Sequence, residues 1–266
     1  MSATTTTTAT STLATLPLAT FEDVRDRFFP GTPVSYAENF TDNAVHDKLV
    51  VHIGARAGST RIRDKNVRRL GGIPLIGYTI LAARALGADR VILNTDSEEY
   101  CRIGEAFGAE CPFIRPGELA RPDVSPGLAS YYAARKVLQE GYPAGYWVEM
   151  YPTSPFRNGA TLRRYVEVLR GAGSCVAVNR ITPPPGRVYA PGGRSVSLDR
   201  DQGLVFYKAT GTFLGYALDA DKRFWRHHEI IRNPVELIDI DTDRDWELAE
   251  SILAAGAYDF GMELPC

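Results

Sequence analysis

Short apolar runs alternate with amphipathic helical patterns from residue 48 to near residue 254. Such alternation is typical of βα units, in which each helix carries the chain back to begin another parallel strand. Parallel strands are covered on both faces and need a large core, which 266 residues with 44% hydrophobic content can supply. The pattern therefore predicts an α/β fold with a doubly wound, mostly parallel sheet.

Individual elements follow from apolar spacing and from helix start signals such as Pro74. The turn-rich stretch that begins with Thr182-Pro183-Pro184-Pro185-Gly186 predicts a small β-rich arm outside the main sheet. Expected strands cover residues 49–54, 90–95, 110–114, 146–150, 175–178, 211–218 and 235–241, and expected helices cover residues 74–86, 128–139, 161–169 and 243–254, with another beginning at 96–99.

Two segments precede the first strand. Residues 1–20 contain nine threonines and no charged side chain, which is too little apolar mass to offset the entropy of ordering, so we expect a flexible tail. In the extension at residues 21–47, four apolar side chains form one face of a short helix that we expect to dock on the body: Phe21, Val24, Phe28 and Phe29. The remaining predicted units are one domain at residues 48–258, with its arm at about 181–207, and a C-terminal tail at residues 259–266.

Charge and cysteine content exclude several classes of protein. Thirty basic and thirty-two acidic side chains give a net charge of -2, so no global field favours nucleic acid or an anionic membrane. No apolar stretch approaches the ~20 residues that cross a bilayer. The four cysteines lack the close pairing of zinc or redox motifs, and we expect free thiols in a reducing cytoplasm.

A cationic turn follows the first predicted strand. Small residues at Ala55, Ala57, Gly58 and Ser59 allow successive backbone N–H groups to converge on an anion. Four cations lie within ten residues of this turn and supply countercharge for a polyphosphate: Arg56, Arg61, Arg63 and Lys65. The alternative is a solvated basic turn after an edge strand.

A pair of carboxylates marks the last predicted strand. Side chains of a strand alternate faces, so Asp239 and Asp241 are expected to point the same way while Ile238 and Ile240 pack inward. A hard divalent ion such as Mg²⁺ would relieve their repulsion, with water and substrate phosphate filling its other positions. The alternative is that Asp241 caps the following helix, although Thr242 or Asp243 can do so equally well.

These features all follow strands, and ligands of doubly wound sheets bind beyond the carboxyl ends of the strands. The turn, residues 94–96, residues 151–157 and the aspartate pair are therefore expected to share one crevice. Phosphate-binding cations beside a metal-binding pair indicate a nucleoside triphosphate and nucleotidyl or phosphoryl transfer. The Gly-Lys-Ser/Thr of a P-loop is missing, which argues against a Walker-type ATPase.

Six motifs in order resemble a known family. The chain is similar to cytidylyltransferases that make CMP-activated sialic acids and related nonulosonates, over roughly residues 48–255. The motifs are Ala55-Arg56-Ala57-Gly58-Ser59 with Lys65-Asn66, Leu70-Gly71-Gly72-Ile73-Pro74-Leu75-Ile76, Asn94-Thr95-Asp96, Arg115-Pro116-Gly117-Glu118-Leu119-Ala120, Pro152-Thr153-Ser154-Pro155-Phe156-Arg157 and Ile238-Asp239-Ile240-Asp241-Thr242.

The resemblance implies a Rossmann-like domain of nucleotidyltransferase type. It implies an enzyme that transfers CMP from CTP to an anionic acceptor, a sialic-acid-like nonulosonate or a related keto-sugar acid, and releases pyrophosphate. It also implies Mg²⁺ as cofactor and a homodimer built through the arm. The partners are then CTP and a small anionic acceptor, with no nucleic acid and no membrane.

The resemblance also assigns roles to residues. Arg56, Ser59 and Lys65 would hold the triphosphate, and Arg115 would help to read cytosine. Asp239 and Asp241 would bind the metal, and with Arg56 and Lys65 they form the expected catalytic group. The full set expected around CTP is Ala55, Arg56, Gly58, Ser59, Arg61, Lys65, Asn66 and Arg115, and the set expected around the acceptor is Tyr151, Thr153, Ser154, Arg157, Lys208 and Thr210.

Departures from the family pattern lie mostly on the acceptor side. Thr60 and Arg61 follow the turn serine where the sialate enzymes usually have Lys, and Tyr151 stands in place of Gln. Lys208 and Thr210 stand where an Arg and an Asn are usual. The sequence therefore leaves two alternatives open: a cytidylyltransferase that acts on a phosphonate or another specialised small acceptor, and a catalytically decayed nucleotide-binding homologue. His52, inside the first strand, is expected to pack between layers.

Overall fold

The computed structural model describes residues 18–31, 46–59, 61–181, 186–189, 195–198, 206–218 and 227–265. The predicted N-terminal tail up to residue 17 lies outside these ranges, as do Thr60 and much of the predicted arm.

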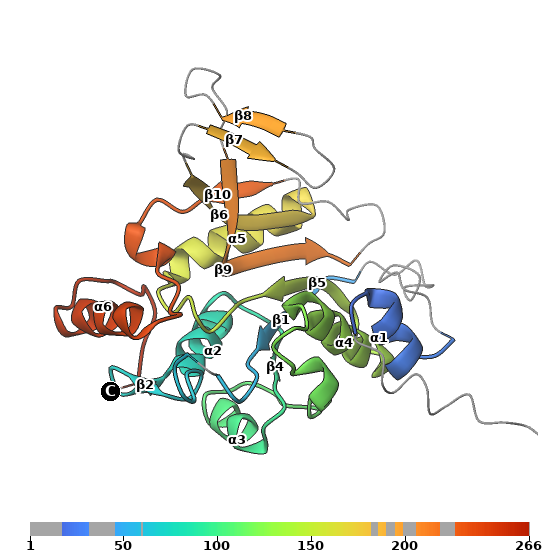
Figure 1. Cartoon of the computed structure of the whole chain (residues 1–266). Coiled ribbons are helices and arrows are strands. Elements are labelled where there is room, and N and C mark those ends of the chain that lie inside the picture. The colour runs from blue at the N-terminus through green and yellow to red at the C-terminus, as the bar shows by residue number, and fades with distance from the viewer. Residues whose placement is uncertain are drawn as a thin grey trace, which may run out of the picture.

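A six-stranded sheet forms the centre of the molecule (Figure 1). Its order is β10-β6-β9-β5-β1-β4, with β1 parallel to both β4 and β5, β10 parallel to β6, and β9 antiparallel to both of its neighbours. The predicted α/β class and mostly parallel sheet are confirmed. The strands are β1 (Lys48–Gly54), β4 (Arg90–Asn94), β5 (Ala144–Glu149), β6 (Ser174–Ile181), β9 (Phe206–Ala217) and β10 (His228–Ile230).

Helices cover both faces of this sheet, as Figure 1 shows. Helices α2 (Leu75–Ala85) and α5 (Gly159–Ala172) pack on one face, and α4 (Pro126–Gln139) packs on the other. No described helix is long and apolar enough to cross a membrane. The remaining elements are α1 (Phe21–Phe28), α3 (Glu98–Ala106), α6 (Asp243–Ala254), the short helices η3 (Gly117–Leu119) and η6 (Pro234–Leu237), and two hairpins, β2 (Arg69–Leu70) with β3 (Ile73–Pro74) and β7 (Gly186–Tyr189) with β8 (Ser195–Leu198).

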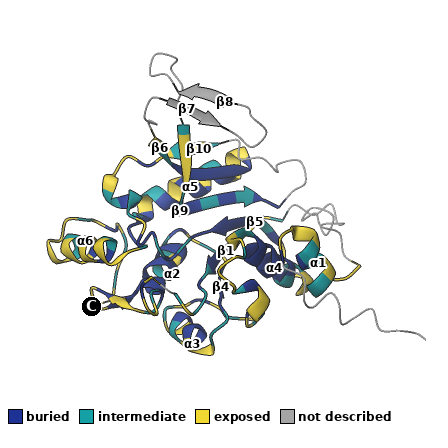
Figure 2. Ribbon diagram, in the orientation of Figure 1, coloured by how far each residue is buried: buried dark blue, intermediate teal, exposed yellow. Residues whose placement is uncertain are grey.

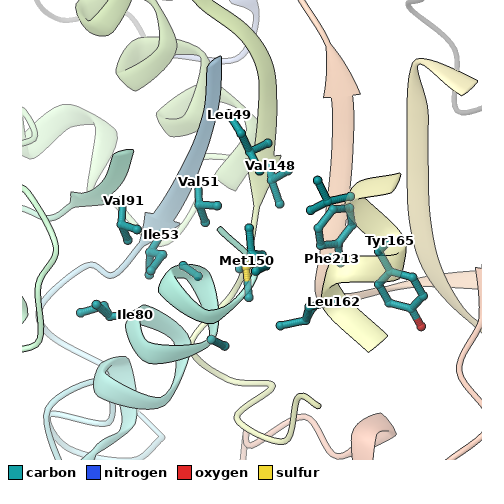
Figure 3. Packing of buried hydrophobic residues seen from close by; sticks show 14 of the residues in the cluster. Leu49, Val51, Ile53, Ile80, Val91, Val148, Met150, Leu162, Tyr165 and Phe213 are labelled. Atoms are coloured by element: carbon teal, nitrogen blue, oxygen red, sulfur yellow. The ribbon is translucent and has the colours of Figure 1, made fainter. Parts of the chain in front are cut away.

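Strand β1 separates two cores because its side chains alternate between the faces of the sheet. Leu49, Val51 and Ile53 point into the larger core with residues of α2 and α5, as Figure 3 shows. Val50 packs on the opposite face with Trp147 and side chains of α4. Figure 2 shows the sheet and the inner sides of these helices as the buried part of the molecule. Burial on both faces explains why residues 49–53 of β1 are all apolar except His52.

The N-terminal extension docks as predicted. Helix α1 begins at a capping box in which Thr20 and Asp23 each accept from the other's backbone N–H. Val24 is fully buried, and the helix lies against α4 (Figure 1). The apolar cluster at this contact contains Leu18, Val24 and Phe29 from the extension, with Leu119, Leu128, Tyr131 and Tyr132.

Two predicted strands are wrong. At residues 110–114 there is only an isolated parallel bridge between Ile92 and Glu110. At residues 235–241, the cap that Asn233 gives to Val235 starts a short helix in place of a strand. The chain then runs extended, and Ile240 donates one backbone hydrogen bond to Thr153 at 2.7 Å. Apolar alternation alone did not distinguish this extended segment from a strand, because pairing depends on a neighbour.

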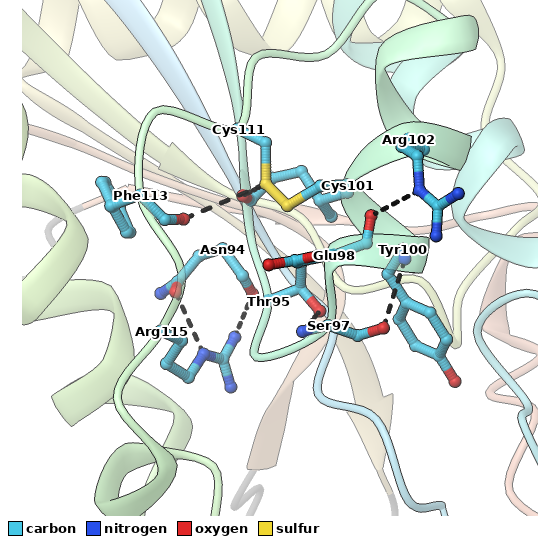
Figure 4. Close-up of a disulfide and its surroundings, with 11 residues drawn as sticks. Asn94, Thr95, Ser97, Glu98, Tyr100, Cys101, Arg102, Cys111, Phe113 and Arg115 are labelled. Carbon is cyan, nitrogen blue, oxygen red and sulfur yellow. Dashed lines mark hydrogen bonds between the residues drawn. A yellow bond between two sulfur atoms is a disulfide. The ribbon is translucent and has the colours of Figure 1, made fainter.

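The expectation of free thiols is also wrong for one pair. Cys101 on α3 and Cys111 form a disulfide, shown in Figure 4. Cys175 is a free, buried cysteine, and Cys266 lies outside the described residues. The bond was not predicted because no known cysteine motif has this spacing, and the two residues meet only through the fold of the segment between them.

The docking of α1 is testable. We expect Val24→Ala to weaken the contact by about 1–3 kcal/mol, because it removes methyl groups from a fully buried position. Amides of α1 should then exchange faster with solvent by hydrogen–deuterium exchange. Exposed Glu22 provides the control, since Glu22→Ala leaves the buried face intact. Equal exchange in the two variants would contradict the docking of α1 through Val24.

Candidate active site

A cavity of about 350 Å³ opens at the carboxyl edge of the sheet. Gly54, at the end of β1, borders it, and Asn94 ends the neighbouring strand β4. Tyr151 and Thr153 border it from the segment that follows β5. The predicted crevice beyond the strand ends is therefore present.

The turn after β1 forms one side of this cavity. Arg56, Ser59, Arg61, Lys65 and Asn66 all border it. Gly58 has a φ of 71°, a backbone conformation that favours glycine, and this lets the chain reverse within a few residues. The side chain of Asn66 fixes the turn by donating to the carbonyl oxygen of Arg56 at 3.0 Å.

The turn does not offer all its backbone N–H groups to a ligand. Ala57 donates to the carboxylate of Asp96 at 2.7 Å, and Ala55 donates to the carbonyl oxygen of Asn94 at 3.0 Å. Neither Ala55 nor Gly58 borders the cavity among the described residues. The expected convergence of successive N–H groups is thus limited, and the side chains provide most of the attraction for an anion.

Cations dominate the cavity wall. Among the described residues, five cationic side chains and one carboxylate border it: Arg56, Arg61, Lys65, Arg115, Arg121 and Asp241. Such an excess of one sign in a concave, partly desolvated site concentrates the field and attracts a polyanion.

Asp241 joins two of these cations. Lys65 donates to its carboxylate at 2.9 Å and to the carbonyl oxygen of Ile240 at 2.7 Å, and a nitrogen of Arg61 lies 3.3 Å from the same carboxylate. Burial raises the pKa of Asp241, but Lys65 and then Arg61 outweigh burial and leave it below its ordinary value. The carboxylate is therefore ionised at neutral pH.

Asp239 lies apart from this group. It is exposed and does not border the cavity, because residues 238–241 are outside the sheet and strand alternation does not set their directions. Thr242 caps α6, with its side chain accepting from Asp245, so the alternative in which Asp241 is the cap is wrong. No group of three His, Cys, Asp or Glu side chains that could hold a metal ion occurs in the described part of the chain.

Arg115 and Asn94 form a buried polar pair at the base of the cavity, shown in Figure 4. The Nε of Arg115 donates to Oδ1 of Asn94 at 3.0 Å, and its Nη2 donates to the carbonyl oxygen of Asn94. Burial lowers the pKa of Arg115 to about 10, so it still carries its charge at neutral pH. Arg115 therefore presents a fixed, charged guanidinium to the cavity.

Sequence reasoning missed the wall opposite the turn. Leu119, Val124, Ser125, Pro126 and Ala129 border the cavity from η3, the following loop and the first turns of α4. Ser125 caps α4 by accepting from Gly127 at 3.3 Å. The signal was present as a Ser-Pro pair at a helix start, where the cap and the first helical position are expected.

Tyr151 and Thr153 border the cavity, whereas the other residues expected around the acceptor do not. Ser154 is buried. Lys208 is exposed on β9, and the hydroxyl of Thr210 donates to the carbonyl oxygen of Ala177 at 3.1 Å. Ser154, Lys208 and Thr210 therefore do not form part of the cavity wall.

Arg157 holds the backbone beneath the cavity. It is fully buried, and its guanidinium donates to the carbonyl oxygens of Tyr151, Gly211 and Thr212 and to the hydroxyl of Thr79, at 2.7 to 2.9 Å. Four of its five N–H groups are thus bonded, and the buried side chain does not border the cavity. We therefore treat Arg157 as a residue that positions the Tyr151 loop.

Glu149, at the end of β5, is a buried carboxyl group in contact with Tyr151. The hydroxyls of Tyr151 and Tyr216 each donate to its carboxyl group at 3.4 Å, and Ser130 also bonds it. Burial raises the pKa of Glu149 to about 7 because these bonds compensate only part of the desolvation. Glu149 thus titrates near neutral pH inside the fold.

The fold and the cationic cavity at the carboxyl edge define an α/β protein of nucleotidyltransferase type. Its fold is similar to that of a CMP:2-keto-3-deoxy-manno-octonic acid synthetase solved with CTP, with a TM-score of 0.55, 15% identity and coverage of 79% of this chain and 100% of the other. A 4-diphosphocytidyl-2C-methyl-D-erythritol synthase from Anaerococcus prevotii gives a TM-score of 0.56, with 12% identity and coverage of 79% and 99%.

Sequence comparison shows the family. The family described as Cytidylyltransferase matches residues 50–251, and the chain belongs to it. A CMP-N,N'-diacetyllegionaminic acid synthase from Legionella pneumophila is 31% identical over 225 residues, covering 77% of this chain and 96% of the relative. A pseudaminic acid cytidylyltransferase from Campylobacter jejuni is 28% identical, covering 74% of this chain and 93% of the relative.

The role of Arg157 can be tested by stability. We expect Arg157→Met to lower the free energy of unfolding by about 3 kcal/mol or more, because it removes all four hydrogen bonds of a fully buried guanidinium, two of them to the buried groups of Thr79 and Thr212. Urea unfolding measures the change. Exposed Arg163, which makes one bond to Ala85, serves as the control, and Arg163→Met should cost under about 0.5 kcal/mol. Similar losses in both variants would contradict the assignment.

The raised pKa of Glu149 predicts a pH-dependent stability. An acid whose folded pKa is above its unfolded value binds more protons in the folded state, so stability falls as pH rises through the interval from 4.5 to about 7. The loss is on the order of 2–3 kcal/mol. We expect Glu149→Gln to remove this decline, measured by urea unfolding at pH 5 and pH 8. An unchanged decline would show that another group causes it.

Proposed function

We propose that the protein transfers CMP from CTP to a nonulosonate-type sugar acid and releases pyrophosphate. The observation that carries the proposal is the cationic cavity at the carboxyl edge of the sheet in a chain that belongs to the cytidylyltransferase family. The two relatives named above are a CMP-N,N'-diacetyllegionaminic acid synthase and a pseudaminic acid cytidylyltransferase, which indicates the class of acceptor.

In this proposal the turn after β1 holds the triphosphate. Arg56, Lys65 and Arg61 border the cavity and would neutralise the phosphate oxygens, together with the hydroxyl of Ser59. The acceptor hydroxyl attacks the α-phosphorus in line, forming one O–P bond as the bond to the pyrophosphate oxygen breaks. Fixed cations stabilise the negative charge that grows on the leaving group, so positioning and charge neutralisation supply most of the rate.

Asp241 fits a role beside the metal that the family implies. It is ionised, it borders the cavity, and it lies next to the cations expected to meet the triphosphate. Mg²⁺ is usually held by one or two carboxylates together with substrate phosphates and water, so a larger protein cage is unnecessary. Bound there, the ion would activate the acceptor hydroxyl and neutralise phosphate charge. Asp239 does not border the cavity, so the proposal gives this role to Asp241 alone.

Tyr151 and Thr153 are the acceptor residues that the cavity supports. Arg157, Lys208 and Thr210 do not border the cavity. Fewer polar residues are therefore available to bind the acceptor than we expected. This observation keeps a phosphonate or another small anionic acceptor as the second candidate. A homodimer, a cytoplasmic location and a magnesium requirement complete the proposal, and light scattering and activity after chelation test the first and the last.

The experiment measures pyrophosphate release from CTP and Mg²⁺ with N,N'-diacetyllegionaminic acid, N-acetylneuraminic acid and small phosphonates. We expect release with a nonulosonate. Release with a phosphonate alone would support the second candidate, and CTP binding without turnover would indicate a decayed homologue. Absence of both binding and turnover would contradict the proposal.

Lys65 provides a matched test of the triphosphate site. We expect Lys65→Ala to reduce kcat/KM by about 100-fold or more. The substitution removes a cation whose attraction to the phosphate charge is stronger in the transition state than in the ground state. Lys48 is the control because its ion pair with Asp89 has the same length, 2.9 Å, as the pair of Lys65 with Asp241. Lys48 does not border the cavity, and Lys48→Ala should leave kcat/KM within about twofold.

A further inference from the structure

His52 is a buried polar residue in an otherwise apolar strand. It is 2% exposed, and it faces α4 together with Val50, two residues earlier on β1. Its ring stacks on that of Trp147, with centroids 5.6 Å apart and an angle of 22° between the planes. His52 also borders the cavity, next to Gly54, Arg115 and Tyr151. The sequence predicted its burial but gave it no part in the site.

A chain of hydrogen bonds fixes the tautomer of this ring. The Nε of Arg115 can only donate, so the atom of Asn94 that it meets at 3.0 Å is an acceptor, Oδ1. The amide nitrogen of Asn94 then donates to the carbonyl oxygen of Ala129 at 2.8 Å and to Nε2 of His52 at 3.0 Å. Nε2 is therefore an acceptor and carries no proton, and the proton of the neutral ring is on Nδ1.

The Nδ1–H group has no acceptor in the described part of the molecule. Nδ1 is a buried side-chain atom there that lacks a hydrogen-bond partner. A buried donor without an acceptor costs the full desolvation of that group, on the order of 1–3 kcal/mol, and is rare unless something completes it. Nδ1 has almost no exposed surface, so an acceptor would have to reach it from the cavity that His52 borders.

We infer that His52 is a substrate-binding residue whose Nδ1–H donates a hydrogen bond to an oxygen or ring nitrogen of a molecule in the cavity. This inference rests on the proposed function, since CTP and the sugar acid are the two molecules that can bring such an atom. Burial, and then the charge of Arg115, lower the pKa of His52 to about 3. The ring therefore stays neutral and acts as a donor, not as a general base.

Imidazole ¹⁵N spectra of the full chain test the tautomer directly. We expect one neutral histidine with a protonated Nδ1, which disappears in His52→Phe. Phenylalanine keeps an aromatic ring of similar size on Trp147 and removes both nitrogens. The Nδ1–H resonance should move downfield when its partner binds. A ring protonated on Nε2, or a resonance that neither CTP nor acceptor moves, would overturn the inference.

Binding measurements then identify the partner. If the acceptor atom belongs to CTP, His52→Phe should weaken CTP binding by about 3- to 10-fold in calorimetry, the effect of one neutral hydrogen bond. If it belongs to the sugar, CTP binding should stay within twofold while KM for N,N'-diacetyllegionaminic acid rises by about the same factor. Unchanged values for both would overturn the inference.

A second variant distinguishes loss of the hydrogen bond from His52 Nδ1–H from a change in the packing around its ring. Trp147→Phe disturbs the surface on which the His52 ring lies but keeps Nδ1–H, so it should leave CTP affinity and KM within about twofold. A loss as large as that of His52→Phe would assign the effect to packing and contradict donation. Failure of the wild-type protein to bind CTP at all would instead refute the proposed function.

Discussion

Parallel pairing of β1 with both β4 and β5 is the constraint on which the site depends. Its register places Gly54 beside Asn94 and His52 beside Glu149, so three strands end at one edge. Neighbouring strands are about 4.8 Å apart, and residues distant in sequence are therefore within reach of one ligand. The turn after β1, the wall before α4 and the Tyr151 loop all begin from this edge. The cavity forms between them because they start at the same end of the sheet.

The two faces of β1 differ in composition: one is apolar, and the other carries buried polar side chains near the cavity. The face toward α2 and α5 is apolar, with Leu49, Val51 and Ile53 in a large core. The face toward α4 becomes polar as it approaches the cavity, where His52, Asn94 and Glu149 are buried. Burying polar groups costs free energy unless they are paired. These buried polar residues are therefore better explained by the side chains that they position than by stability. It orients Arg115 and Tyr151, which both border the cavity.

The sequence was sufficient to predict most strands and helices of the domain and the turn with Lys65, because apolar periodicity and small residues near cations are local signals. It was insufficient for Asp239 and Arg157, whose surroundings depend on contacts distant in the chain. Asp239 was placed by strand alternation, but residues 238–241 have no strand partner. Arg157 was expected to bind the acceptor, but its guanidinium donates to four groups that come from three separate segments of the chain. The disulfide likewise needed the fold to bring Cys101 to Cys111.

The ion pairs of Asp241 with Lys65 and Arg61 link the two strongest sequence motifs and offset part of the charge of the cationic cavity. Without countercharge, five cations around one cavity would repel one another. Asp241 offsets part of that repulsion by pairing with Lys65 and Arg61, across 176 residues of sequence in the case of Lys65. In the proposed function, the incoming triphosphate would relieve the positive charge that remains while Asp241 keeps the two cations in position. Asp241 would then order the side chains proposed to bind phosphate before the triphosphate arrives, which would lower the entropy lost on binding.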